Sequence, residues 1–454
     1  MNISDPLHAA AQTVLTRCLG LPGGANLVIF ADETTLSTAL LLVEQADALE
    51  MQPVLAYFST PTQQRLGKQP LPTGLQLAIK EGDAVLVCLS SSPACFNFRD
   101  SVREFAYNTG CKVGHMPGIN EATLLLADVD YEELSRHCEL LATALLQSNS
   151  LTIKTTDAAG GQHCLTVPLD PGTLLPITSD GIIQRASWGN IPSGETFIAP
   201  APFSGHGSIV INGSIRNYVM ADGEELVFYF EQGQLMRWEP ENSPAARHFV
   251  AEAVEPARAQ HDANWSQLGE VGLGANPRVE QLTGSMLLDE KKYGTAHIAL
   301  GDNTDMGGQV KSNIHYDMVT LRPEVAVDGR VIIRDGRLEL NPAGLLAGLV
   351  EAQPPADWTI DLPLSYTAVR GQADDQGRLR RMWDTDSGRV CWVMVGTDEI
   401  ARHAAEIYEA LRQQRRPSTL ATIRDRVTTI HDDAAMLATA YLLSRYGLVK
   451  PEIS

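Results

Sequence analysis

The sequence predicts a mixed α/β protein with a doubly wound α/β domain (1–150), a mainly β domain (151–350) and a small C-terminal domain (356–454). Apolar strands alternate with amphipathic helices through the first domain, an alternation typical of a largely parallel sheet. Short strands separated by Gly and Asp turns then take over. A Pro-containing segment at 351–358 indicates a linker before the C-terminal domain.

The N-terminal elements follow one another in the order expected of a doubly wound sheet. The glycines of "LPGGAN" precede the first strand, and the turn after that strand, "ADETT", is acidic. A phosphate-binding turn follows its strand and attracts an anion, so we expect a scaffold or a lid here. The expected strands are "ANLVIFA", "QPVLAYF", "DAVLVCLS" and "CKVGHMPG", and the expected helices are "ETTLSTALLLVEQADAL", "FRDSVREFAYNTG" and "YEELSRHCELLATALLQS".

The middle part is expected to consist of antiparallel hairpins with one inserted helix. The segments "DGR" and "EQGQ" are typical of hairpin turns. The expected helix is "SPAARHFVAEAVEPARAQH". The expected strands lie in "LTIKTTDAAGGQHCLTVPL", "GSIVINGSI", "ELVFYFEQGQL" and "EVAVDGRVIIRDGRLEL".

The C-terminal part combines a strand pair in "RLRRMWDTDSGRVCWVMV" with three expected helices at 397–413, 418–428 and 432–446. A hairpin with three short helices resembles a winged helix. The segment is also similar to small winged-helix domains that recognise peptides in peptide-modifying pathways. A structural cap or a dimerisation module is the alternative. Its arginines more often form a solvated helix face than a DNA-binding surface.

Composition excludes several classes of protein. The net charge is −20, which argues against nucleic acid or anionic membrane as a partner. No run of about 18 apolar residues is present, and "MNISDPLHAAAQTVL" has no basic start or apolar run of a signal peptide. The seven cysteines form no CxxC pair, which disfavours a zinc ribbon or a disulfide framework. We expect a cytoplasmic protein.

Histidines and acids of the middle part stand singly beside apolar or glycine residues. In "SNIHYDMV", His315 and Asp317 are two apart and share one face of the expected strand. Such groups are costly to bury unless they are paired or bind a metal. Two imidazoles and three carboxylates are a common ligand set for one or two divalent ions, but this pattern alone leaves an ion pair open. The candidates are Glu195, Glu270, His297, His315 and Asp317.

Four ordered motifs resemble those of the aminopeptidase T-like metallopeptidases, also called thermophilic leucyl aminopeptidases. They are "NIPSGETFIAP", "LGEVGLGANP", "DEKKYGTAHIALGDN" and "SNIHYDMV", and the resemblance covers roughly residues 1–345. It implies an α/β domain, a β-rich domain with two divalent metals, and a homodimer. The same resemblance implies five metal ligands: Glu195, Glu270, His297, His315 and Asp317.

Two features separate this sequence from that family. The family usually has a tyrosine seven residues after the histidine of H-I-A-L-G, where this chain has Thr304. The run "GDNTDMGGQVKSNIHYDM" also resembles the 2,5-dihydroxypyridine dioxygenases, which share the fold and hold one Fe(II) with two histidines and a carboxylate. Their first histidine falls on Glu270 here, which favours the two-metal hydrolytic set.

The sequence therefore predicts a metal-dependent hydrolase, most simply an aminopeptidase, acting on a peptide or amide through metal-activated water. Glu195 is the candidate acceptor of the water's proton, and Zn, Co or Mn the expected ions. The first alternative is a mononuclear Fe(II) ring-cleaving dioxygenase acting on a small molecule. The second is a catalytically altered protein that binds or modifies a peptide through its C-terminal domain.

Overall fold

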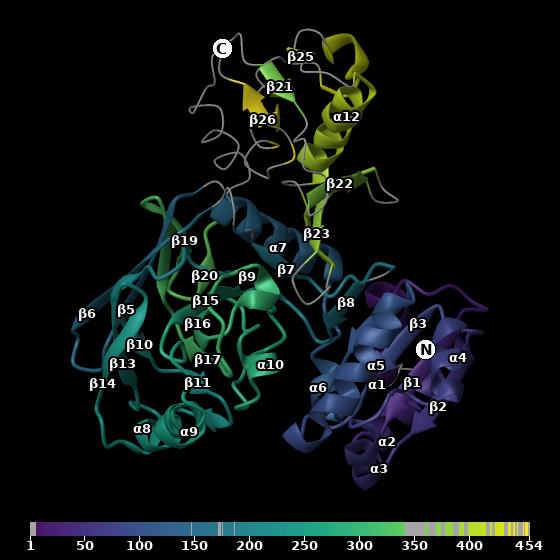
Figure 1. The fold of residues 1–454 in the computed structure, drawn as a ribbon, viewed down its shortest axis with the longest axis horizontal. Coiled ribbons are helices and arrows are strands. Elements are labelled where there is room, and N and C mark those ends of the chain that lie inside the picture. The colour runs from purple at the N-terminus through teal and green to yellow at the C-terminus, as the bar shows by residue number, and fades with distance from the viewer. Residues whose placement is uncertain are drawn as a thin grey trace. The chain divides into compact units, whose positions relative to one another are not determined.

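The computed structural model describes residues 6–340, apart from 147, 171–173, 175 and 186, and short stretches between 359 and 452. The chain forms two compact units (Figure 1). The α/β unit comprises Met1–Ser135 with 179–194 and 276–279, and the β-rich unit comprises the remaining residues. In the described residues, no helix has the length and apolar character needed to cross a membrane.

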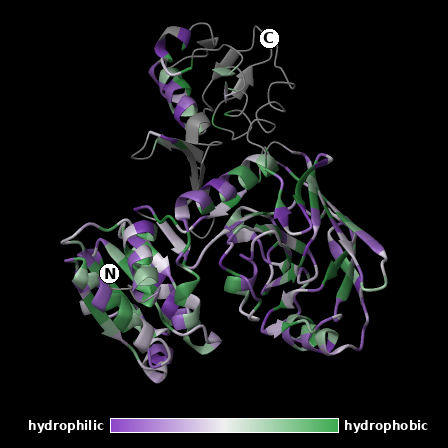
Figure 2. Ribbon diagram, turned by 180° about the vertical axis from the view of Figure 1, so that it is seen from behind, coloured by the Kyte–Doolittle hydropathy of each residue, from purple (hydrophilic) through white to green (hydrophobic). Residues whose placement is uncertain are grey.

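The α/β unit is built on a five-stranded sheet in the order β2-β1-β3-β4-β8, in which every pairing is parallel. Its central strands are buried because their sequences are continuously apolar, and Figure 2 shows hydrophobic strands with mixed helices here. The expected parallel sheet is confirmed. Its strands are β1 (Asn26–Ala31), β2 (Gln52–Tyr57), β3 (Ala84–Val87), β4 (Lys112–His115) and β8 (Ser187–Asn190).

Helices connect the strands of this sheet in the predicted alternation. Helix α2 follows β1 and α5 follows β3, as "ETTLSTALLLVEQADAL" and "FRDSVREFAYNTG" predict. The helices are α1 (Pro6–Thr13, continued by a π-helical turn at Val14–Cys18), α2 (Leu36–Ala48), α3 (Thr60–Leu66), α4 (Thr73–Lys80), α5 (Phe96–Asn108, preceded by a 3-10 turn at Pro93–Cys95) and α6 (Glu121–Leu125). The next helix, α7 (Tyr131–Leu146), starts in this unit and continues into the β-rich unit at Arg136.

The acidic turn after β1 is an internal structural element. The buried carboxylate of Asp32 accepts hydrogen bonds from the backbone N–H of Ser90 at 2.5 Å and from Nε2 of Gln63 at 2.9 Å. Burial raises the pKa of Asp32, but hydrogen bonds from Thr34, Gln63 and Ser90 outweigh it and hold the pKa below its ordinary value. The carboxylate therefore ties the loops after β1 and β3 together.

The first sheet of the β-rich unit has eight strands in the order β14-β13-β10-β6-β5-β18-β19-β20. Its hairpins form where the turn sequences predict them, so β13 pairs with β14 and β18 with β19, both antiparallel. The strands are β5 (Ser150–Thr156), β6 (Gln162–Pro168), β10 (His206–Ile211), β13 (Leu226–Glu231), β14 (Gln234–Glu239), β18 (Glu324–Val327), β19 (Arg330–Arg334) and β20 (Arg337–Leu338).

The second sheet has seven strands in the order β12-β11-β17-β16-β15-β9-β7. It consists of β7 (Ile177–Ser179), β9 (Glu195–Ile198), β11 (Ser214–Ile215), β12 (Tyr218–Val219), β15 (Leu268–Gly274), β16 (Ala296–Gly301) and β17 (His315–Thr320). The helices of this unit are α8 (Pro244–Phe249), a π-helical turn (Val250–Val254), α9 (Glu255–Ala259), α10 (Met286–Asp289) and a 3-10 turn (Thr304–Met306).

Aromatic side chains connect the two sheets through α8. The ring of Phe249 lies 5.2 Å from Phe228 on β13 and 5.7 Å from Tyr316 on β17, centroid to centroid. Ser243 caps the helix, because its hydroxyl accepts a hydrogen bond from the backbone N–H of Ala246. Tyr316 therefore faces the core, and strand alternation directs the side chains on either side of it to the opposite face of the sheet.

The described residues of the C-terminal part confirm some predicted elements and correct another. The expected strand pair is β23 (Leu379–Asp384) with β24 (Val390–Met394), and the first expected helix is α12 (Asp398–Gln414). The helix expected at 418–428 is wrong at its two ends, where the structure has β25 (Ser418–Thr419), paired with β21 (Thr359–Asp361), and a 3-10 turn at Arg424–Arg426. Five residues of this segment are β-branched, which lowers helix propensity. Ile423 is helical, and residues 420–422 lie outside the described residues.

The remaining elements of this part complete two small sheets. Strand β21 also pairs with β26 (Lys450–Glu452), and β22 (Val369–Ala373) pairs with β23. The linker at 351–358 and most of the helix expected at 432–446 lie outside the described residues. The winged helix stays a prediction.

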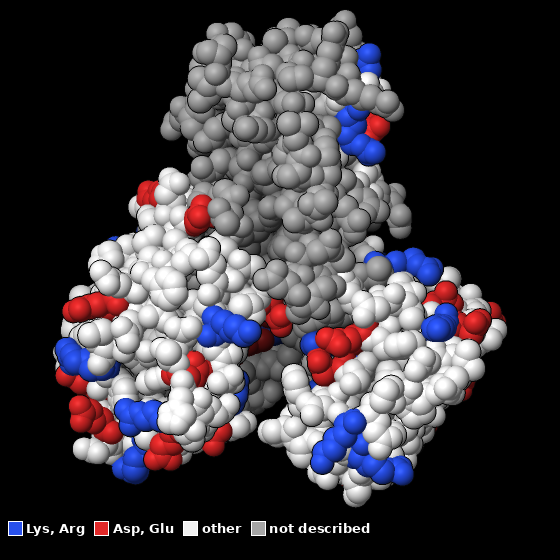
Figure 3. Space-filling view, in the orientation of Figure 1, with Lys and Arg blue, Asp and Glu red and all other residues white. Residues whose placement is uncertain are grey.

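Charged side chains of both signs alternate over the surface. On the face shown in Figure 3, Lys and Arg lie among Asp and Glu within each of the two units. A nucleic acid needs a continuous basic track, and the described residues on this face offer none. The arrangement agrees with the net charge of −20.

Candidate metal centre

Neighbouring strands of the seven-stranded sheet carry a cluster of buried polar side chains. Strands β17, β16, β15 and β9 lie next to one another in that order. In the antiparallel register, Asp317 lies opposite Ala299, and Glu270 lies opposite the same residue from the other side. The sheet thus brings together all five residues that the sequence singles out: Glu195, Glu270, His297, His315 and Asp317.

The imidazoles and carboxylates alternate along this cluster. Nε2 of His315 lies 3.0 Å from Oδ1 of Asp317 and 3.3 Å from Oε2 of Glu270. Nε2 of His297 lies 3.1 Å from Oε1 of Glu270 and 3.7 Å from Oε2 of Glu195. Glu270 therefore stands between the two histidines. The ion pair of His315 and Asp317 that the spacing left open is present, and it is part of a larger cluster.

The loop between β16 and β17 orients His315. Its Nδ1 lies 2.7 Å from the backbone carbonyl of Asp302, so Nδ1 carries the hydrogen and Nε2 faces the carboxylates. Asp302 is itself fixed, because its side chain accepts hydrogen bonds from the N–H groups of Ser312 and Thr304. A histidine held in this way presents the lone pair of its other nitrogen to a metal. The Gly-rich segment "GDNTDMGGQ" lies in this loop.

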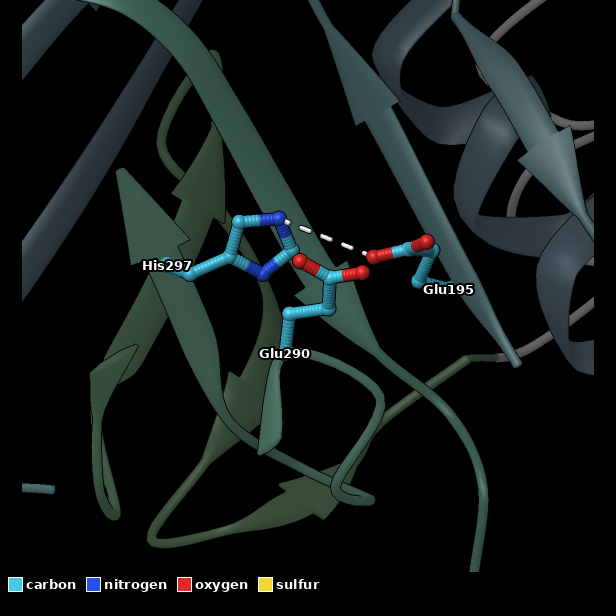
Figure 4. Close-up of side chains that lie close together, drawn as sticks. All are labelled: Glu195, Glu290 and His297. Carbon is cyan, nitrogen blue, oxygen red and sulfur yellow. Dashed lines mark ion pairs between the residues drawn. The ribbon is translucent and has the colours of Figure 1, made fainter. Parts of the chain in front are cut away.

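Two further residues of the cluster, Glu290 and Lys291, are absent from the sequence-based prediction. Nζ of Lys291 lies 2.8 Å from Oε1 of Glu195 and also contacts Oε1 of Glu290. Figure 4 shows the carboxylates of Glu195 and Glu290 turned toward each other and toward the imidazole of His297. Both residues follow α10 in "DEKKYG", a charged run that is usually a solvated turn. Their position within the third motif, "DEKKYGTAHIALGDN", could have indicated that they belong to the site.

The cluster is closed on one side and open at His315. The side chain of Lys291 is fully buried and that of Glu195 is 5% exposed, whereas that of His315 is 33% exposed. Nδ1 of His297 is buried and has no hydrogen-bond partner among the described residues. A substrate would therefore reach the cluster at His315.

Burial and mutual charge shift the pKa values in this cluster. Burial lowers the pKa of His297, but the carboxylate of Glu270 outweighs it and raises the value to about 9. Burial raises the pKa of Asp317, but His315 outweighs it and holds the value well below its ordinary range. The pKa of Glu290 is raised to about 8 by burial and by the charge of Glu195. Burial alone would lower the pKa of Lys291, but Glu195 and Glu290 raise it.

The donor set fits divalent cations. Four carboxylates and two imidazoles are the ligands that Zn, Mn and Co bind in proteins. They form two groups, and within each group the ligand atoms lie within 4.8 Å of one another. The groups are Glu195, Glu290 and His297, and Glu270, His315 and Asp317. Each of the five predicted ligands belongs to one group, and metal binding by them stays a prediction.

Tyr316 does not take the place of the tyrosine that the resembled family has at the position of Thr304. Thr304 stands at the family position, and its hydroxyl donates to Asp302 at 2.8 Å within the loop. Tyr316 faces the core, where burial raises its pKa. The ring of Tyr293 lies 5.9 Å from that of His137.

The chain combines a parallel α/β unit with an antiparallel unit that carries the buried carboxylates and imidazoles. Residues 132–338, somewhat less than half of the chain, match the thermophilic metalloprotease (M29) family. The resemblance drawn from the four motifs is thereby confirmed over this segment, which is shorter than the roughly 345 residues expected. No curated protein matches the sequence.

Solved structures share the fold. The 2,5-dihydroxypyridine dioxygenase from Pseudomonas putida KT2440 has a TM-score of 0.57 and 18% identity, covering 74% of this chain and 97% of that one. AmpT from Thermus thermophilus has a TM-score of 0.50 and 16% identity, covering 74% of this chain and 99% of that one. At these identities the likeness concerns the fold.

Proposed function

We propose that this protein is a metal-dependent hydrolase that cleaves a peptide or amide bond, most simply as an aminopeptidase. The observation that carries the proposal is the buried cluster of four carboxylates and two imidazoles, open to solvent at His315. A divalent ion bound there would supply Lewis acidity, acting on water and on the scissile carbonyl. The match to the metalloprotease family supports the same chemistry.

The protein's own groups have distinct roles in this proposal. His315 and Asp317 bind the ion at the open edge, and the carbonyl of Asp302 keeps the imidazole in the required orientation. Glu270 lies between both histidines and joins the two ligand groups.

A carboxylate must take up the proton that the attacking water releases. The sequence favours Glu195 for this role. Glu290 lies in the same group, and its pKa of about 8 suits proton uptake near neutral pH. We assign the proton to this pair of carboxylates. Replacing each by Gln, with metal content measured beside turnover, separates the roles: the acceptor loses turnover and keeps its metal, whereas a ligand loses both.

The alternative of a mononuclear Fe(II) dioxygenase has one supporting observation. His297, His315 and Asp317 would supply two histidines and one carboxylate. However, Glu270 lies between the two histidines and contacts both, so an ion there would have two carboxylates among its ligands. We therefore place the hydrolase first.

The function is tested by metal analysis together with two activity assays. The hydrolase predicts metal-dependent turnover of amino-acid p-nitroanilides or short peptides. A dioxygenase predicts bound iron and O₂ uptake with a phenol or a hydroxypyridine. Full metal loading without turnover of any peptide or amide substrate would overturn the hydrolase proposal.

Partners and location complete the proposal. We propose a cytoplasmic homodimer; the dimer rests on the family resemblance, and light scattering tests its mass. Peptide binding by 356–454 is proposed from the weaker resemblance of that segment. Peptide binding that survives deletion of this segment would count against its role.

A further inference from the structure

Lys291 is a fully buried lysine in direct contact with two candidate metal ligands. Its Nζ lies 2.8 Å from Oε1 of Glu195 and contacts Oε1 of Glu290 as well. Its side chain has no exposed surface. The ammonium is therefore part of the interior of the cluster and cannot leave it by a simple rotation into solvent.

The contacts of Lys291 concern only one of the two ligand groups. Glu195 and Glu290 are both carboxylates of the group that contains His297. The other group, Glu270, His315 and Asp317, has no ion pair with a lysine among the described residues. The chain thus provides one group whose carboxylates already hold a cation and one group whose carboxylates face only imidazoles.

A lysine and a metal ion compete for the same oxygens. Divalent ions bind carboxylate oxygens at about 2.0–2.6 Å, and an ammonium at 2.8 Å from Oε1 of Glu195 already uses a lone pair of that atom. An ion between Glu195 and Glu290 would also lie close to the buried positive charge of Lys291. In a site from which water is excluded, repulsion between like charges is weakly screened.

The turn after α10 holds Lys291 beside Glu290. Lys291 directly follows Glu290, and its backbone N–H donates to the carbonyl of Leu288 at 3.0 Å, at the end of α10. The same turn therefore places the carboxylate of Glu290 and the ammonium of Lys291, which neutralises it, inside the cluster. Removing one partner of a buried ion pair leaves an uncompensated charge, which strongly destabilises a protein.

We infer that the centre takes one divalent ion per chain, at Glu270, His315 and Asp317, and that the ammonium of Lys291 occupies the place of a second cation between Glu195 and Glu290. The inference rests on the proposed use of a metal. It changes the two-ion centre that the family resemblance implies into a centre with one ion and one lysine.

Metal stoichiometry tests the inference without an activity assay. The full chain is incubated with excess ZnCl₂ or MnCl₂, desalted and analysed for bound metal. We expect one ion per chain in the wild type and two in Lys291→Met, because the freed carboxylates then bind a second ion. The matched control is Lys292→Met, since Lys292 is the next residue along the chain and its Nζ donates to the carbonyl of Glu280. The control should bind one ion.

Two ions per chain in the wild type, or one ion in Lys291→Met, would overturn the inference. If Lys291→Met does not fold, anomalous scattering at the zinc edge from wild-type crystals gives the same answer. A single peak at Glu270, His315 and Asp317 supports the inference, and a peak between Glu195 and Glu290 overturns it.

These outcomes are separate from those of the proposed function. One bound ion without turnover of any peptide or amide would refute the hydrolase and support the lysine's role. Two bound ions with full turnover would support the hydrolase and refute the role of Lys291. A wild type that binds no ion would refute both.

Discussion

The imidazole of His297 lies directly over the α-carbon of Gly272. The two residues are opposite each other in the pairing of β15 with β16, and a Cβ added at Gly272 would lie 2.0 Å from Nε2 of the imidazole. Only glycine leaves room for the ring in this position. A backbone position two residues from Glu270 therefore sets where a candidate ligand points.

Gly272→Ala should displace the ring of His297 from Glu270 and weaken metal binding, because Glu270 is then no longer held between the two imidazoles. We expect a loss of affinity of roughly 10–100-fold, the range for changes that misorient a ligand. Calorimetric titration with Zn²⁺ measures it. Gly74→Ala is the control, because nothing lies within 4 Å of a Cβ at that position. Wild-type affinity in Gly272→Ala would show that the position of His297 does not set that of Glu270.

The metal-free protein should lose stability as the pH rises through about 9. The pKa of His297 is raised to about 9 in the folded state, against about 6.5 when unfolded. A group whose pKa is raised by folding stabilises the folded state. This stabilisation is fully present below the pKa of the unfolded chain and is lost as the pH rises through the pKa of the folded state. We expect the free energy of unfolding to fall by roughly 1–3 kcal/mol between pH 7 and pH 9.5.

Urea unfolding in the presence of a chelator measures this change. Burial and the charge of Glu195 raise the pKa of Glu290 to about 8, so its contribution has the same sign. His297→Gln is the control and should lose most of the dependence above pH 7. A metal-free wild type that becomes more stable at pH 9.5 would contradict the assigned protonation.

Tyr316→Phe should leave activity unchanged. The hydroxyl of Tyr316 is buried without a hydrogen-bond partner among the described residues, and its ring packs on Phe249 away from the cluster. A buried polar group without a partner costs stability, so removing the hydroxyl should be nearly neutral or stabilising. Steady-state kinetics and thermal unfolding check both expectations. A fall in kcat of tenfold or more would show that Tyr316 replaces the missing family tyrosine.

Lys291→Met should strongly destabilise the metal-free protein. Glu195 and Glu290 would then be buried without their cation, a loss of roughly 3–5 kcal/mol. Excess Zn²⁺ should restore much of the stability, since binding to the folded state alone stabilises it. Chemical unfolding with and without Zn²⁺ gives the comparison. Equal stabilities of wild type and variant in chelator would contradict the role of the ion pair.

The sequence predicted the parts of the site that follow from strand geometry and ordered motifs. His315 and Asp317 are two apart on a strand, so their shared face was predictable from spacing. The burial of Glu290 and Lys291 was not predictable, because "DEKK" has the composition of a solvated turn. Only the packing of the chain after α10 buries these residues. The start of the helix expected at 418–428 failed for a related reason, since pairing of Ser418 and Thr419 with β21 outweighed a weak helical pattern.

The most direct test of the central claim is a metal titration that follows binding and turnover in the same samples. The protein is stripped with a chelator and Zn²⁺ or Mn²⁺ is added back in steps, with bound metal and p-nitroanilide hydrolysis measured at each step. We predict that hydrolysis rises in proportion to bound metal and that Asp317→Asn, measured in parallel, gains neither. Hydrolysis that does not change with bound metal, or a fully loaded protein that hydrolyses no peptide or amide, would contradict the account.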